Sequence, residues 1–182
     1  MQLHAYQSHW PLLFHYLQAR LWSVVAPHAE GIEHVGSTAV PGLTAKPIID
    51  IDIVVATPAD VVATRTALTQ IGYQWRGDQG IPGREAFAQP RGWFRHHLYV
   101  CQTGTLALRN HLCLRDALRN DPVLCQRYAD LKVALSRTPG ITMTDYVAGK
   151  SDFIVTILHR HGFTAAELTS IQHANRAPQK AD

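Results

Sequence analysis

The chain has 182 residues, of which 46% are hydrophobic and 17% charged, a balance typical of a soluble globular protein with a single domain-sized core. Its formal net charge of +3 suits an anionic partner, whether small molecule or nucleic acid. No apolar run approaches the roughly 20 residues that span a bilayer, and the N-terminus lacks the pattern of a secretory signal, so a cytoplasmic location is expected.

Periodicity and capping signals predict five elements in the first half of the chain. In chain order these are a helix over 10–21, strands over 31–35 and 47–55, a helix over 57–72 and a short strand over 73–76. Ser8 is the expected N-cap of the first helix, whereas Thr57 caps the second, which Gly72 ends. The first helix is amphipathic and is therefore expected to cover another layer of the protein.

The second half of the chain predicts a hairpin followed by helices. The hairpin strands are expected at 85–89 and 93–101. From about Leu106 the pattern is helical, and apolar residues mark helices over 108–118, 124–135 and 146–158. We therefore predict one α/β or α+β domain over residues 1–173, a small mixed sheet flanked by helices with a helical C-terminal portion, and a polar, frayed tail over 174–182.

Two aspartates, Asp50 and Asp52, interrupt an otherwise aliphatic strand. Because side chains alternate along a strand, both carboxylates share one face, with Cα atoms roughly 6.5–7 Å apart. This spacing lets them bind one divalent cation, Mg²⁺ or Mn²⁺, which prefers oxygen ligands. The alternative is a solvated stripe, but strands disfavour Asp, and Ile48 and Val54 flank the pair on the same face. The pattern therefore favours a metal site.

A loop of small residues lies just before this strand. Gly36, Ser37 and Thr38 offer backbone N–H groups and hydroxyls that suit a phosphate, although such a sequence alone is more often a plain turn. Lys46 lies between the loop and Asp50, where its ammonium could reach the same phosphate. The order of strand, Gly-Ser turn, loop and Asp-x-Asp strand resembles that of the nucleotidyltransferase superfamily, in which the turn holds nucleotide phosphates and the acids hold metal.

The segment IEHVGSTAVPGLTAKPIIDI resembles the signature of the GrpB family, and the resemblance continues through HHLYV, RNHLCLRDALRNDP, YADLK and GKSDFI to about residue 161. It implies a nucleotidyltransferase-like fold but no established reaction. By the same resemblance Arg115, Lys132 and Lys150 would form a cationic wall for a polyphosphate, whereas taken singly each is a solvated helix residue. The GKS triplet is no Walker A motif, because Asp145 stands where that motif requires glycine.

Two positions depart from the pattern that the resemblance implies. Superfamily members usually supply a third carboxylate from a neighbouring strand, whereas 93–101 presents Arg95, His97 and Tyr99 on the corresponding face, and Glu85 is the only nearby acid. Relatives usually have histidine where this chain has Tyr99. His97 faces the same way and is the candidate catalytic residue beside the acid pair.

Three functions remain open. The first is a metal-dependent nucleotidyltransferase that binds a nucleoside triphosphate and transfers a nucleotidyl group to an unidentified acceptor. The second is a non-catalytic module for a nucleotide or a CoA-type ligand, and the third is a metal-assisted phosphohydrolase with His97 as general base. In each case a nucleotide or phosphorylated small molecule is the expected partner, rather than nucleic acid, because no basic stripe is interleaved with aromatic residues.

Overall fold

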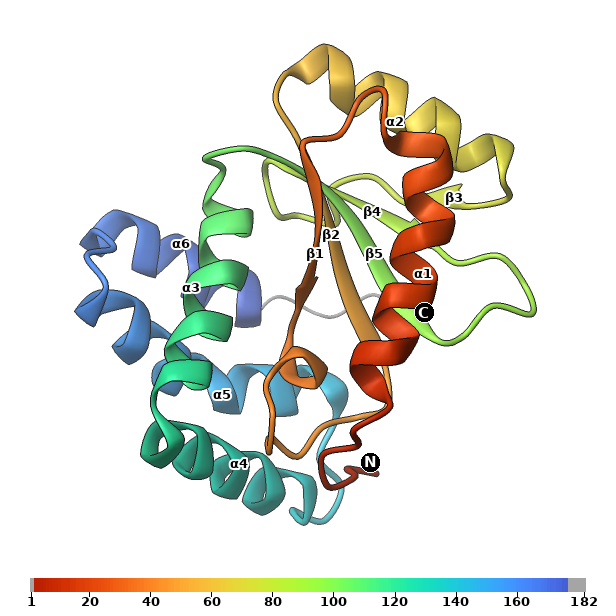
Figure 1. Ribbon diagram of the computed structural model, residues 1–182. Coiled ribbons are helices and arrows are strands. Elements are labelled where there is room, and N and C mark those ends of the chain that lie inside the picture. The colour runs from red at the N-terminus through yellow and green to blue at the C-terminus, as the bar shows by residue number, and fades with distance from the viewer. Residues whose placement is uncertain (1, 177–182) are drawn as a thin grey trace.

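A computed structural model describes residues 2–176, within which a five-stranded sheet has helices on both faces (Figure 1). The strands are β1 (Gly31–Val35), β2 (Ile49–Val55), β3 (Gln74–Trp75), β4 (Arg84–Ala88) and β5 (His96–Gln102). The helices are α1 (Trp10–Val25), α2 (Pro58–Gln70), α3 (Leu106–Asn120), α4 (Pro122–Ser136), α5 (Met143–Arg160) and α6 (Ala165–Arg176), with a 3₁₀-helix, η1 (Ser37–Ala39), after β1. The prediction of a mixed α/β fold is confirmed.

The strand that carries the aspartates lies inside the sheet, in the order β1-β2-β5-β4-β3. β2 pairs antiparallel with β1 and parallel with β5, whereas β5 pairs antiparallel with β4, as expected for the hairpin. The aliphatic face of β2 packs against α1 and α2, and its residues Ile49, Ile51, Ile53 and Val55 are each at most 1% exposed. Alternation along β2 therefore turns both aspartates toward the opposite face.

The opposite face of the sheet is covered by the C-terminal half of the chain. Figure 1 shows α3 across the sheet from α1, with α4 and α5 below it. Val40 and Leu43, in the loop after η1, are buried in a second core with residues of α3, α4 and α5, including Tyr128 and Ile157. The loop between the Gly-Ser turn and the acid strand is thus held against the C-terminal helices.

The two N-terminal capping predictions have different outcomes. Thr57 forms a capping box with Asp60 at the start of α2, as predicted. The prediction for Ser8 is wrong: His9 is the N-cap of α1, no side chain caps the helix, and Pro11 lies in its first turn. Proline lacks the backbone N–H, so a first turn that contains it has one fewer donor to satisfy.

The hairpin connection is longer than predicted and spans residues 89–95. The side chain of Gln89 bridges it, because its Oε1 accepts from the backbone N–H of His96 at 2.7 Å and its Nε2 donates to the carbonyl of Trp93 at 3.1 Å. Local hydrogen bonds of this kind replace strand pairing.

One helix, α6, was not separately predicted. Gly162, with a φ of +85°, ends α5, and Phe163, Leu168 and Ile171 then pack on Leu158. The predicted frayed tail lies outside the described residues from 177 onward, whereas residues 174–176 belong to α6.

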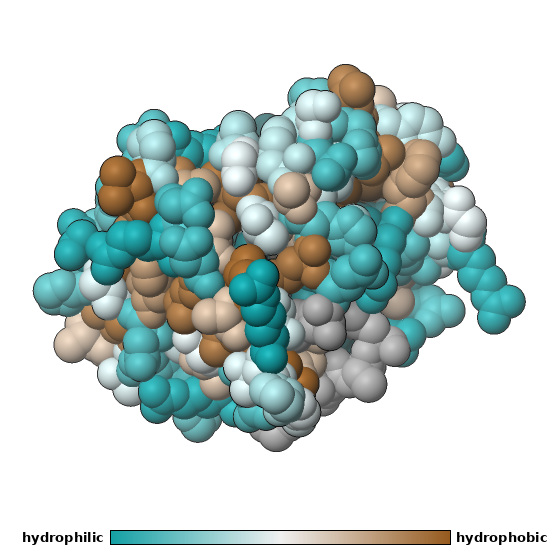
Figure 2. Space-filling view, turned by 90° about the horizontal axis from the view of Figure 1, so that it is seen from below, coloured by the Kyte–Doolittle hydropathy of each residue, from teal (hydrophilic) through white to brown (hydrophobic). Residues whose placement is uncertain are grey.

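None of the helices within residues 2–176 combines the length and the apolar character that crossing a membrane would require. Figure 2 views the end formed by α4 and α5, where hydrophobic residues lie in small groups among hydrophilic ones.

Candidate functional site

The two aspartates lie on the face of the sheet that α3 covers, and each is paired with a histidine. Strand register places Asp50 beside His97 and Asp52 beside Tyr99 of β5. His97 Nδ1 donates to Asp50 Oδ1 at 2.8 Å, in a pair whose side chains are 35% and 28% exposed. Asp52 is fully buried, and His111 Nδ1, from α3, donates to its Oδ2 at 2.7 Å. The carboxylate pair is therefore oriented from both β5 and α3.

The hydrogen bonds and charges within these pairs favour the ionised form of Asp50 and the protonated form of His111. Burial alone would raise the pKa of Asp50, but the hydrogen bond from His97 and the charges of His97 and His111 outweigh it, so the pKa lies below its ordinary value. Burial alone would lower the pKa of His111, but the charge of Asp52 and its hydrogen bond outweigh it and raise the pKa. Asp50 is thus an ionised oxygen donor at neutral pH.

The turn after β1 places Gly36 directly against Asp50. Gly36 has a φ of +69° and a ψ of −170°, a backbone conformation that is essentially restricted to glycine. A Cβ at this position would overlap the carboxylate of Asp50, lying 2.8 Å from its Cγ. Thr38, the buried residue of the turn, donates from Oγ1 to the carbonyl of Ile48 at 3.2 Å. The Gly-Ser turn is therefore fixed in contact with the acid pair.

Three of the chain's four lysines gather beside this turn. Lys132 is buried and donates from Nζ to Ser37 Oγ at 2.9 Å and to a carbonyl of the following loop. Lys150 and Lys46 place their Nζ atoms 4.5 Å and 5.2 Å from the ring centroid of Tyr146. The predicted phosphate-binding lysines are thus brought together by three separate segments of the chain.

The electrostatics of this lysine cluster (Lys46, Lys132 and Lys150) favour a bound anion. Burial, and then the charge of Lys150, lowers the pKa of Lys132 to about 7, although Asp50 opposes the shift. Burial, and then the charge of Lys46, lowers the pKa of Lys150 to about 8. An anion such as a phosphate would offset the repulsion within the cluster and favour the charged ammonium groups.

The predicted phosphate ligand Arg115 lies against β1 instead. Its Nη1 donates to Glu33 Oε2 at 2.6 Å and to the carbonyl of His34 at 3.1 Å, while its Nε donates to Asp116 Oδ1 at 2.7 Å. Burial opposes the charge of Arg115, but the hydrogen bonds to Asp116 and Glu33 raise its pKa. Arg115 therefore joins α3 to the edge of the sheet, and its role in phosphate binding stays a prediction.

Replacing Arg115 with methionine tests these two roles separately. We expect the free energy of unfolding to fall by about 1–3 kcal/mol, because the partly buried carbonyl of His34 and the carboxylates of Glu33 and Asp116 lose their charged donor, while triphosphate affinity changes less than about twofold. Chemical denaturation and titration calorimetry measure the two quantities. The control is Arg109→Met on the same helix as Arg115, which removes an exposed ion pair with Glu167 of α6 and should be much less destabilising. A large loss of affinity in Arg115→Met would show that Arg115 binds phosphate.

Within residues 2–176, no carboxylate of the neighbouring strands takes the place of the third acid. Glu85, the predicted substitute, pairs with Val100 of β5 and so lies on the face that α1 and α2 cover, where it accepts a hydrogen bond from Trp75. That expectation is wrong because strand register turns Glu85 away from the aspartates. On the acid face β4 presents Arg84, whose Cζ lies 4.3 Å from the ring centroid of Tyr99.

The carboxylate oxygens nevertheless fit a divalent cation. Asp52 Oδ1 is buried without a hydrogen-bond partner among the described residues, and the hydrogen bond recorded for Asp50 uses Oδ1, not Oδ2. Within residues 2–176 no three His, Cys, Asp or Glu side chains are grouped as a complete ligand set. Mg²⁺ usually takes one or two carboxylates and completes its shell with water and substrate phosphates. An incomplete protein shell therefore suits a cation that arrives with a nucleotide.

Two contributors to the site, His111 and Tyr146, were missed in the sequence. His111 precedes Arg115 by four residues, so the two side chains share the face of α3 that meets the sheet. This spacing can be recognised in the sequence, but the contact of His111 with Asp52 cannot, because Asp52 lies in a distant segment. Tyr146 reads as an ordinary apolar residue of an amphipathic helix and carries no separate signal.

Known proteins resemble this chain in sequence. A family model described as GrpB protein matches residues 1–160. The UPF0157 protein YqkA of Bacillus subtilis is 34% identical over 151 residues, which cover 83% of this chain and 44% of YqkA. A UPF0157 protein of Halalkalibacterium halodurans is 34% identical over 169 residues, which cover 87% of this chain and 81% of that protein. The chain thus matches less than half the length of YqkA but most of the second relative.

Solved structures resemble it in fold. Conserved protein GrpB from Enterococcus faecalis superposes with a TM-score of 0.76 at 28% identity, over 94% of this chain and 98% of that one. Cid1 in complex with its short product ApU superposes with a TM-score of 0.51 at 15% identity, over 73% of this chain and 43% of Cid1, a likeness of fold alone. The fold is of the nucleotidyltransferase type, and the chain belongs to the GrpB family.

Proposed function

We propose that this protein binds a nucleoside triphosphate together with a divalent cation and transfers the nucleotidyl group to an acceptor hydroxyl. The observation that carries the proposal is the convergence of the lysine cluster, the Gly-Ser turn and the acid pair: Lys132 Nζ lies 2.9 Å from Ser37 Oγ, and Gly36 packs on Asp50. Such a site would offer cations and backbone donors to the phosphates and carboxylates to a cation bound with them. Cid1, which shares the fold, is described as a poly(U) polymerase with MgGTP bound.

Each part of the site has a role in this reaction. The backbone of Gly36 and Ser37 and the lysine cluster would hold the phosphates, and His97 orients the carboxylate of Asp50 through Nδ1. Asp50 and Asp52 would hold Mg²⁺ or Mn²⁺, which when bound would offset charge on the phosphate oxygens. The acceptor hydroxyl would form a bond to the α-phosphorus and lose its proton as the bond to pyrophosphate breaks.

A second candidate is a non-catalytic module for a nucleotide or a CoA-type ligand. It is favoured by the strand beside the acids, since β5 supplies His97 and Tyr99 opposite Asp50 and Asp52 and no carboxylate. In this reading the phosphate site is kept and the two-metal chemistry of related enzymes is lost. Hydrolysis of the triphosphate, with water in place of the acceptor, is the third candidate.

Asp50→Asn is expected to lower pyrophosphate release by roughly a hundredfold or more, because it removes charge that stabilises the transition state through the bound cation. The assay incubates the protein with each of the four nucleoside triphosphates and Mg²⁺ or Mn²⁺, and follows pyrophosphate, free phosphate and thermal shift. Asp130→Asn, which changes an exposed carboxylate on α4, is the control and should behave as the wild type.

The three candidates give different results in this assay. Pyrophosphate release that depends on an added hydroxyl acceptor and on Asp50 supports transfer. Nucleotide binding without pyrophosphate release, across sugar, amino-acid and protein acceptors, rules transfer out and supports the binding module. Free phosphate released without any acceptor supports hydrolysis instead.

A further inference from the structure

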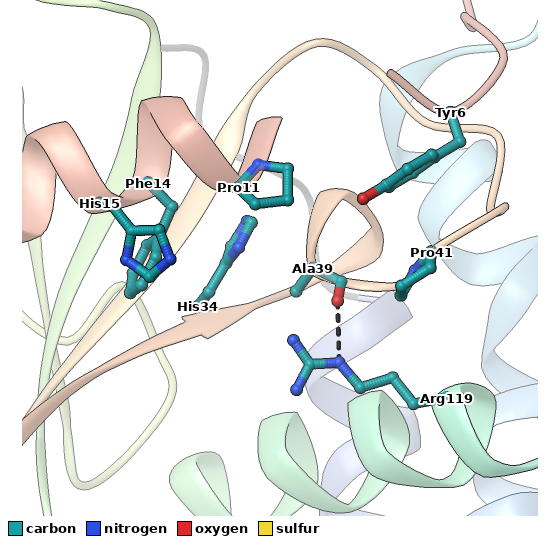
Figure 3. A pocket seen from close by; sticks show the side chains of 8 residues that line it. All are labelled: Tyr6, Pro11, Phe14, His15, His34, Ala39, Pro41 and Arg119. Carbon is teal, nitrogen blue, oxygen red and sulfur yellow. Dashed lines mark hydrogen bonds between the residues drawn. The ribbon is translucent and has the colours of Figure 1, made fainter. Parts of the chain in front are cut away.

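A second pocket opens on the α1 side of β1, and one of its residues, His34, donates from Nε2 to Thr38 Oγ1 of the Gly-Ser turn at 3.1 Å. It has a volume of about 370 Å³ and is lined by side chains that include Tyr6, Phe14, His34 and Arg119 (Figure 3). His34 pairs with Ile51 across the strands, so it faces α1, whereas Asp50 and Asp52 face α3. Neither the aspartates nor the lysine cluster line this pocket. Its size falls within the range of small-molecule sites.

Two stacked aromatic side chains line the pocket. The rings of His34 and Phe14 stack with centroids 4.6 Å apart and an interplanar angle of 7°. Burial, which outweighs the opposing charge of Asp50, lowers the pKa of His34 to about 4, so the ring is neutral at physiological pH. Pro11 and Pro41 lie on either side of the opening in Figure 3. A planar apolar group would pack well against these surfaces.

One fixed cation stands at the edge of this surface. Arg119 Nε donates to the carbonyl of Ala39 at 2.8 Å, which holds the side chain at the pocket. Its Nη groups donate no hydrogen bond to the described residues, and the nearest carboxylate oxygen, Asp116 Oδ1, lies 4.0 Å from Nη1 and already accepts from Arg115. Arg119 and His34 line the same pocket (Figure 3). A guanidinium with unused donors is a ready partner for a carboxylate.

We propose that this pocket binds a small organic carboxylate with a planar, apolar body. The carboxylate accepts from the Nη groups of Arg119, and the body packs on Phe14 and His34. A monoanion suits the site better than a polyphosphate, because Arg119 is the single permanently charged side chain among the described residues that line the pocket, whereas the lysine cluster lies on the other face of the sheet. The proposal does not rest on the nucleotidyl-transfer reaction.

Binding of 2-naphthoate and of its uncharged amide, 2-naphthamide, tests the proposal by calorimetry and by NMR shift mapping on the wild-type protein. We expect the carboxylate to bind at least about tenfold more tightly than the amide, in keeping with a hydrogen bond to a charged group, and to shift the signals of Phe14 and His34. Inorganic triphosphate should not displace it. Displacement by triphosphate would place the probe in the lysine cluster and overturn the proposal, as would equal affinity for the two probes or no binding.

A matched pair of variants gives a second test. Arg119→Gln is expected to weaken 2-naphthoate binding at least about tenfold and to leave 2-naphthamide binding unchanged. Arg127→Gln, which removes the same charge from the exposed face of α4, should leave both affinities unchanged. Equal losses in the two variants would show a general charge effect and contradict the proposal. Because the probe comparison uses the wild-type protein, it holds even if Arg119→Gln is unstable.

Discussion

Gly36→Ala is expected to unfold at a lower temperature and to lose most of its affinity for a nucleoside triphosphate. The φ of +69° and ψ of −170° at this position cost a residue with a Cβ about 1–3 kcal/mol. The new methyl group also overlaps the carboxylate of Asp50, lying 2.8 Å from its Cγ. For a chain of this length the backbone term alone lowers the melting temperature by about 2–10 °C. Scanning calorimetry and nucleotide titration measure the two effects.

Gly31→Ala is the matched control for this change. Gly31 is the first residue of β1, the strand that ends just before Gly36. Its φ is not positive, and a Cβ there would meet nothing within 4 Å. We expect it to keep both stability and affinity near those of the wild type. If Gly36→Ala behaved in the same way, the close contact between the Gly-Ser turn and Asp50 would not be needed for binding, and the proposed site would be wrong.

Lys132→Met is expected to weaken triphosphate binding by about tenfold to a hundredfold, as the loss of a hydrogen bond to a charged group predicts. The same change removes the hydrogen bonds of Lys132 to Ser37 and to the following loop, but at pH 6 we expect the relief of a buried charge to outweigh this loss and to stabilise the free protein. Lys132 is 2% exposed, and its pKa of about 7 shows that burial disfavours its charged form. Methionine has a similar length and carries no charge into the core. Stability and function are thus expected to change in opposite directions.

The pH dependence of stability gives a sharper test of the same residue. The pKa of Lys132 is about 7 in the folded protein, whereas its ordinary value is 10.5. Between these pH values the unfolded chain therefore binds more protons than the folded one. The free energy of unfolding of the wild type consequently rises as pH rises through this window. The advantage of Lys132→Met should therefore be largest below about pH 7 and should shrink toward pH 10. Denaturation of both proteins across this range, with Arg127→Met as the exposed control on α4, measures it. A constant difference would contradict the shift.

Local patterns in the sequence predicted much of the fold. The limits of β1 were predicted correctly, and the alternation in β2 identified its aliphatic face, because both depend on backbone geometry that repeats every two residues. Thr57 was identified as a cap because its partner Asp60 is three residues away. The failures at Ser8 and in the hairpin connection arose where a proline or a side chain changed the hydrogen bonding of the backbone.

The candidate site likewise contains residues that local sequence patterns identified and residues that they did not. Gly36, Ser37, Asp50 and Asp52 were identified as candidate site residues because they occur within one short segment with recognisable spacing. His111 escaped because its contact with Asp52 joins α3 to β2 and leaves no local trace. Glu85 was expected beside the aspartates because it is near in sequence, and only the register of β4 against β5 shows that it faces the other way.

By itself, the sequence determined that two carboxylates share one face of a buried strand and that a small-residue turn precedes them, since chain geometry alone sets both. Only the tertiary structure decided what lies opposite. The positions of Lys132 and Lys150 near the turn, and of Arg119 at a separate pocket, depend on how α3, α4 and α5 pack on the sheet. That packing follows from the burial of apolar residues far apart in the chain, such as Val40 against Tyr128 and Ile157. This packing cannot be predicted from the periodicity of any single segment.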